Sequence, residues 1–64
     1  MRHTELWVRL EQALGPTYAR SWAHDFVITE LGHRTTEEAL ASGVAPKDVW
    51  AAVWRALELP PSER

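Results

Sequence analysis

The hydrophobic positions of this chain recur at helical spacing in segments that glycine and proline separate. The first segment has apolar residues three and four positions apart and stops at Gly15-Pro16, which predicts a helix over residues 4–14. The second segment begins with Pro16 and is apolar around more than half of the helical circumference. It predicts a central helix over residues 17–31, which Gly32 ends in a left-handed conformation.

Two further helices are predicted in the second half of the chain. Thr35 and Glu38 have the spacing of a capping box, which favours a short helix over residues 36–42 that ends at Gly43. Pro46 then favours the start of a helix over residues 46–58, whose apolar side chains share one face. No segment alternates as a half-buried strand does, so we predict no strand.

These patterns predict an all-α fold, a small bundle of four helices of which three are longer and one is short. The chain is expected to be a single helical domain over residues 1–64, with its ordered core over about 4–59. The side chains expected to be buried lie on the inward faces of these helices: Leu10, Leu14, Trp22, Phe26, Leu40, Val49, Val53 and Leu57.

Composition and charge narrow the range of functions. The 64 residues include no cysteine and four tryptophans, so packing of large side chains must hold the fold without a disulfide or a thiolate metal site. Seven basic against nine acidic residues give a net charge of −2, which makes DNA an unlikely partner. The chain shows neither a signal peptide nor the roughly 18 apolar residues of a membrane span, so we expect a cytoplasmic protein without membrane contact.

Catalytic and metal-binding patterns are weak. The three histidines, His3, His24 and His33, share no spacing of three or four residues that would place two ligands on one helical face. His24 and Asp25 are adjacent, and adjacent helical residues point about 100° apart. There is no nucleophile motif and no glycine-rich phosphate loop, so we predict no enzyme activity, no metal and no cofactor.

Glu30 is an unusual residue in the predicted central helix, because the helical wheel places it inside the apolar arc. A carboxylate in such surroundings needs a partner. Arg34 or backbone amides at the start of the third or fourth helix could supply one. We therefore predict that Glu30 is ion-paired or hydrogen-bonded and braces the fold.

A helix-turn-helix pattern is also present. Ala39, Gly43 and Val49 stand at the relative positions 1, 5 and 11 that such motifs use, with Val44 and Val53 as core positions. The outward positions of the second helix would offer one basic side chain and no arginine, asparagine or glutamine to read bases: Ala45, Pro46, Lys47, Trp50, Ala51 and Trp54. We therefore interpret the pattern as a helical corner, with DNA binding as the alternative.

Two tryptophans suggest a docking surface. If Val49 and Val53 fill the core, Trp50 and Trp54 lie one above the other at its edge, where part of each ring would be exposed. Ile28 points away from the main apolar arc of its helix. We predict a partner-binding surface formed by Trp50, Trp54 and Ile28 for another protein or a second copy of this chain. The alternative, that both tryptophans belong to the core, remains open.

A family resemblance adds to this interpretation. The residues that carry it are Tyr18-Ala19, Ser21-Trp22-Ala23, Asp25, Leu31-Gly32, Arg34-Thr35, Glu38-Ala39-Leu40, Gly43 and Lys47-Asp48-Val49-Trp50. The chain resembles, from about Trp7 to Leu57, a family of short actinobacterial proteins classified as a domain of unknown function. The resemblance implies no activity, cofactor or catalytic residue. It implies a stand-alone cytoplasmic protein whose gene often lies near those for the recombinase A protein and its regulator.

The function predicted from all of this is a non-enzymatic protein–protein interaction module. The gene neighbourhood that the resemblance implies would link it to DNA repair, and the acidic composition indicates that such a link runs through a protein partner. The alternative is a helix-turn-helix DNA-binding protein. Salt-dependent retention on DNA would favour the alternative, and a recovered protein partner would favour the interaction module.

Overall fold

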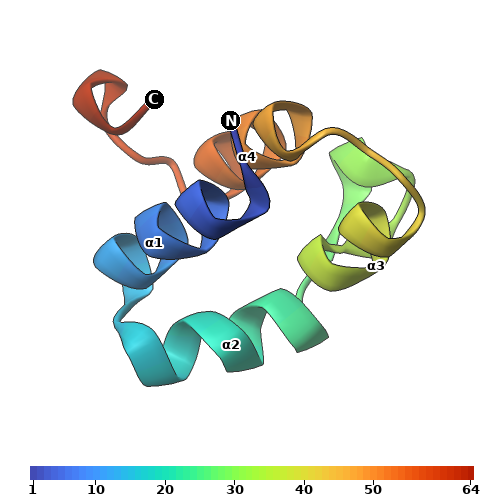
Figure 1. The fold of residues 1–64 in the computed structure, drawn as a ribbon, viewed down its shortest axis with the longest axis horizontal. Helices are drawn as coiled ribbons and strands as arrows, with labels where there is room; N and C mark the ends of the chain where they lie inside the picture. The colour runs from blue at the N-terminus through green and yellow to red at the C-terminus, as the bar shows by residue number, and fades with distance from the viewer.

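A computed structural model describes residues 1–64 and shows a helical fold with one small hairpin (Figure 1). The α-helices are α1 (His3–Leu14), α2 (Pro16–Asp25), α3 (Thr36–Ala41) and α4 (Pro46–Ala56). The strands are β1 (Val27–Ile28) and β2 (Arg34–Thr35), and two short 3-10 helices are η1 (Thr29–Leu31) and η2 (Pro61–Glu63). The prediction of four helices, three longer and one short, is confirmed. No helix combines the length and the apolar composition that crossing a membrane requires.

The corner between α1 and α2 follows from Gly15 and Pro16. Gly15 has a φ of 87°, a left-handed conformation in which a side chain would be strained, and its N–H donates to the Glu11 carbonyl at 2.7 Å. Pro16 then starts α2, where its missing N–H costs no hydrogen bond. The two helices therefore fold back on each other, as Figure 1 shows along the blue and cyan segments.

The α2 helix ends at Asp25 and not at Leu31, so the predicted range 17–31 is wrong in its second half. Phe26 already has extended backbone angles, and Val27 and Ile28 form β1, which pairs antiparallel with β2. Three consecutive β-branched residues at positions 27–29 favour an extended backbone over a helix, because their side chains crowd the preceding helical turn. The prediction that the chain contains no strand is wrong for the same reason.

Phe26 is a second correction. It was expected in the core, but 44% of its surface is exposed, because the early end of α2 moves it to the edge of the fold. Its ring stacks on Trp22, with ring centroids 4.9 Å apart. Of the other residues expected in the core, four are buried and three are partly buried: Leu10, Trp22, Val49 and Val53, then Leu14, Leu40 and Leu57.

The core contains eleven buried hydrophobic residues, four of which are alanines. Its members come from the four α-helices and β1: Leu6, Leu10, Ala19, Trp22, Ala23, Ile28, Ala39, Val49, Trp50, Ala52 and Val53. Thr36 is fully buried beside this core, and its Oγ1 has no hydrogen-bond partner. Small alanine side chains let the helix backbones approach closely around the few large ones.

The start of α3 and the end of α4 have defined caps. Thr35 Oγ1 accepts from the Glu38 N–H at 3.1 Å and Glu38 Oε1 accepts from the Thr35 N–H at 2.9 Å, which confirms the predicted capping box. The α4 helix ends at Ala56, two residues before its predicted end, and Glu58 follows with a left-handed φ of 54°. This turn directs the last residues back along α4.

Candidate interaction surfaces

An open groove of about 390 Å³ runs between β1 and α4 and is called the β1–α4 groove below. Eight residues line it, and five of them are hydrophobic. The eight are Phe26, Val27, Ile28, Thr29, Glu30, Ala52, Arg55 and Ala56. Ile28 and Ala52 are buried and belong to the core, whereas Phe26 and Val27 are 44% and 51% exposed. The groove therefore combines a lining anchored in the core with two large apolar side chains in solvent.

An ion pair lines part of this groove. Arg55 Nε lies 2.8 Å from both carboxylate oxygens of Glu30, and Arg55 Nη2 also donates to Glu30 Oε2. This arrangement is the bidentate geometry that suits a guanidinium and a carboxylate. The hydrogen bond from Arg55 lowers the pKa of the Glu30 carboxyl below its ordinary value of 4.5, against a smaller opposing effect of desolvation.

The prediction that Glu30 is paired is confirmed, although two parts of its reasoning are corrected. Its partner is Arg55 of α4 and not Arg34, and nearly half of the Glu30 side chain is exposed. Glu30 lies in the short helix η1, beyond the end of α2, so the helical wheel that placed it among apolar residues does not apply. Because both charges are in solvent, the pair contributes little to stability and instead presents a fixed pair of charges beside the groove.

Trp50 and Trp54 are not an exposed pair. Trp50 is 2% exposed and Ile28 is 3% exposed, so the apolar surface predicted from these two residues is buried, and only Trp54 remains partly exposed. Residues 60–64 lie over both indoles. The indole N–H groups of Trp50 and Trp54 donate to backbone carbonyls of this segment, at 3.2 Å and 2.9 Å. Two sequence signals point to this contact. Buried indole N–H groups need hydrogen-bond acceptors. Pro60 and Pro61 prevent α4 from continuing, so the chain must turn away from the helix axis.

The α3–α4 corner has the geometry that the spacing of Ala39, Gly43 and Val49 predicts. Ala39 and Val49 are fully buried, and Gly43 has a left-handed φ of 95° in the four-residue turn between the helices. On the exposed side of α4 lie Lys47 and Arg55, together with acidic and small residues. Arg55 is held by Glu30, which leaves Lys47 as the cation of this helix without an ion pair.

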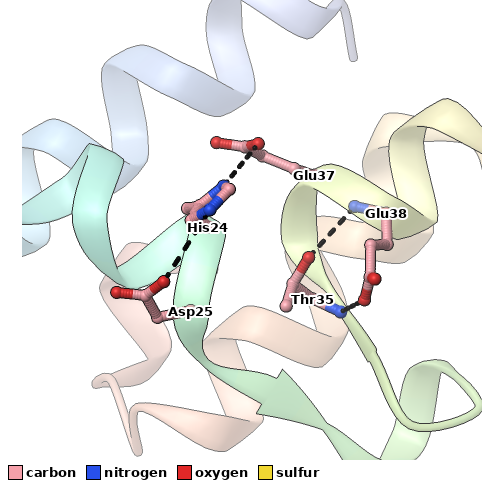
Figure 2. Close-up of polar contacts among 5 residues, drawn as sticks. All are labelled: His24, Asp25, Thr35, Glu37 and Glu38. Atoms are coloured by element: carbon pink, nitrogen blue, oxygen red, sulfur yellow. Dashed lines mark hydrogen bonds and ion pairs between the residues drawn. The ribbon is translucent and has the colours of Figure 1, made fainter.

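His24 joins the end of α2 to the start of α3. Its Nδ1 lies 3.3 Å from Glu37 Oε1 and its Nε2 lies 3.9 Å from Asp25 Oδ1, as Figure 2 shows beside the capping box. The hydrogen bond to Glu37 and then the charges of Glu37 and Asp25 raise the pKa of His24 above 6.5. The two carboxylates approach opposite ring nitrogens and do not converge on one point, and no group of three such side chains could hold a metal ion.

The comparisons with known proteins identify a family whose function is unknown. A search of the curated proteins found no match, and a search of the solved structures found none either. The model of one family, DUF3046, matches residues 1–62. Because this match covers nearly the whole sequence, the chain belongs to the DUF3046 family, which is described as a protein of unknown function.

Proposed function

We propose that this chain is a non-enzymatic cytoplasmic interaction module that binds another protein through the β1–α4 groove. The observation that carries the proposal is the exposure of Phe26 and Val27 beside a mainly apolar groove. Phe26 is the chain's single phenylalanine, and the fold leaves 44% of it in solvent although it has few large residues with which to build a core. Exposed aromatic side chains next to a hollow are typical anchors of protein interfaces.

Phe26 is suited to this role because it is already held in place. Its ring stacks on the buried Trp22 at a centroid distance of 4.9 Å and an interplanar angle of 14°. A partner would therefore lose little affinity in ordering the Phe26 side chain. The groove is open along one side, which suits the apolar side chains of an amphipathic partner helix better than an enclosed small ligand.

The Glu30–Arg55 pair adds one negative and one positive charge to the groove, in a fixed arrangement. Both side chains are about half exposed, so a partner with charged groups at the edge of its apolar face can contact them. Such edge charges favour the correct register and the rate of association more than the affinity. A partner in DNA repair is the part of this proposal that depends on the family resemblance alone.

The experiment compares two variants that add the same charge at equally exposed valines. Val27 lies in the groove and Val8 lies on α1, and each is 51% exposed. Affinity capture with the native chain, Val27→Lys and Val8→Lys, read by quantitative mass spectrometry, should yield a protein that the native chain and Val8→Lys retain and Val27→Lys loses. Calorimetry with that purified protein should then show at least about tenfold weaker binding for Val27→Lys. Equal binding by Val27→Lys would show that the groove is not the contact.

DNA binding by the α3–α4 corner is the second candidate, and the observation in its favour is the left-handed Gly43 between buried Ala39 and Val49. The charge argues against it, because the chain is acidic and α4 offers Lys47 as its one unpaired cation. We expect duplex DNA to bind no better than about millimolar near physiological salt. Micromolar binding that Lys47→Ala or Arg55→Ala abolishes would replace the first proposal.

A further inference from the structure

A second hollow, of about 410 Å³, lies beside η1 and β2 and extends one turn further toward the start of α4 than the β1–α4 groove does. It is called the η1–α4 hollow below. Its hydrophobic lining consists of Leu31, Val44, Ala51 and Ala52. Ala52 is buried in the core and the other three are half-buried, so this part of the lining is anchored in the fold and can still contact an apolar group.

Two oppositely charged side chains face this hollow without pairing. Arg34 of β2 and Asp48 of α4 both line it, and neither forms an ion pair with the other or with any other side chain. The two remaining charges of the lining, Glu30 and Arg55, already bind each other. The hollow therefore offers one free cation and one free anion beside its apolar lining.

The turn between η1 and β2 leaves room for the Arg34 guanidinium. Gly32 has a left-handed φ of 75°, and a Cβ atom at this position would lie 3.6 Å from Arg34 Nη1. The guanidinium thus lies close to the backbone of the turn, at the edge of the hollow. A guanidinium with free N–H groups binds a carboxylate through two parallel hydrogen bonds, and a carboxylate such as that of Asp48 accepts hydrogen bonds from an ammonium group.

We infer that the η1–α4 hollow binds a small zwitterion with an apolar side chain, of the kind that free α-amino acids provide. Arg34 holds the carboxylate of the ligand, Asp48 holds its ammonium group, and Leu31, Val44 and Ala51 contact its side chain. A ligand with a single charge would leave one of the two charged side chains unmatched. The volume lies near the lower end of the range of roughly 300–1,000 Å³ that is usual for small-molecule sites, which suits a ligand of this size.

The inference goes beyond the proposed function and does not depend on it. The two hollows share three lining residues, but Arg34 and Asp48 line the η1–α4 hollow alone. The test needs only the purified chain and no partner protein. Val27→Lys, which is designed to abolish partner binding at the β1–α4 groove, should leave binding of the zwitterion unchanged, so the two ideas can fail separately.

The test is a titration of the ¹⁵N-labelled full chain with L-leucine, followed by NMR spectroscopy. The amide signals of Gly32 and Ala51, which line the hollow, should move and saturate with a Kd of about 1 mM, as expected for a small ligand in an open site. The Gly15 signal at the α1–α2 corner should stay in place. N-acetyl-leucine lacks the ammonium group and leucinamide lacks the carboxylate, so each should bind at least about tenfold more weakly than leucine.

Two variants assign each charge of the ligand to its partner. Arg34→Gln and Asp48→Asn change exposed side chains, so both variants should fold, which circular dichroism can verify. Each should weaken leucine binding at least about tenfold. Arg34→Gln should no longer distinguish leucine from leucinamide, because nothing remains to hold the carboxylate. Asp48→Asn should likewise no longer distinguish leucine from N-acetyl-leucine.

Matched controls remove charges outside the hollow. Lys47 and Glu58 are exposed, form no ion pair and do not line it, so Lys47→Gln and Glu58→Gln should bind leucine as the native chain does. Gly32 and Ala51 signals that stay unmoved in the native chain at tens of millimolar leucine would overturn the inference. So would a blocked ligand that binds the native chain as tightly as leucine, since the apolar lining alone would then explain the binding. Equal weakening by Arg34→Gln and Lys47→Gln would assign the effect to overall charge and not to this hollow.

Discussion

Replacement of Glu58 by glycine is expected to stabilise the fold. Glu58 follows the last turn of α4 with a φ of 54°, and the N–H groups of Glu58 and Leu59 donate back to the carbonyls of Arg55 and Trp54. This is a Schellman motif, in which glycine is the usual residue at the left-handed position. The left-handed conformation costs roughly 1–2 kcal/mol for a residue with a side chain, and the greater flexibility of unfolded glycine offsets about 0.5–1 kcal/mol of the gain.

The loss of the Glu58 charge adds to this gain. A carboxylate near the carbonyl end of a helix is unfavourable by a few tenths of a kcal/mol, and the Glu58 side chain is exposed without an ion pair. We therefore expect Glu58→Gly to raise the free energy of unfolding by about 1 kcal/mol, which for a domain of this size raises the Tm by about 4–8 °C.

The assay is thermal unfolding followed by circular dichroism, with Glu58→Ala as the matched control. Alanine removes the charge but keeps the Cβ atom, so it should give only the few tenths of a kcal/mol that come from the helix end. The two variants together separate backbone strain from charge. If Glu58→Gly proved no more stable than Glu58→Ala, the left-handed turn would not be strained and the reasoning would be refuted.

Four other substitutions test the core and the ion pair. Thr36→Val removes a buried hydroxyl without a partner and should stabilise by about 1 kcal/mol in urea unfolding; a loss of stability would point to a hidden acceptor. Leu10→Ala, at a fully buried position, should cost about 2–5 kcal/mol, whereas Phe26→Ala should cost only about 1–2 kcal/mol because the ring is half exposed. Equal losses would contradict that ranking. Because the folded pKa of Glu30 is lowered, its pairing adds a small stabilisation of the fold above about pH 4.5, which is lost as the pH falls through the folded pKa. The Tm difference between the native chain and Arg55→Ala should therefore narrow from pH 7 to pH 3, and a constant difference would contradict the pairing.

The helices could be predicted from the sequence where local signals agree. Gly15-Pro16 and the Thr35–Glu38 capping box mark boundaries that depend on adjacent residues, and the structure confirms both. The end of α2 was missed because apolar spacing continues through Leu31 although the backbone does not. The β-branched run at 27–29 was the competing signal, and its preference for an extended backbone is realised only through pairing with β2, seven residues away.

The candidate surfaces were harder to predict because they depend on contacts between distant segments. The helical periodicity of the sequence can place Trp50 on one face of α4, but it cannot show that residues 60–64 return to cover that face. Likewise the need of Glu30 for a partner followed from its chemistry, whereas its partner Arg55 lies 25 residues away and depends on how η1 sits beside α4. The exposed Phe26 was missed for a local reason, since its exposure follows from the early end of α2.

The alanines of the core have a consequence for how this domain can change. Ala19, Ala23 and Ala39 are fully buried, so a larger side chain at any of them would have to be accommodated within the packed core. Enlarging such positions typically costs about 1–3 kcal/mol, a large share of the stability that a domain of this size can hold. The interior therefore leaves almost no room for drift toward larger residues. New binding specificity in this scaffold would have to arise at exposed positions such as Val27, where a substitution changes the surface and leaves the helix spacing intact.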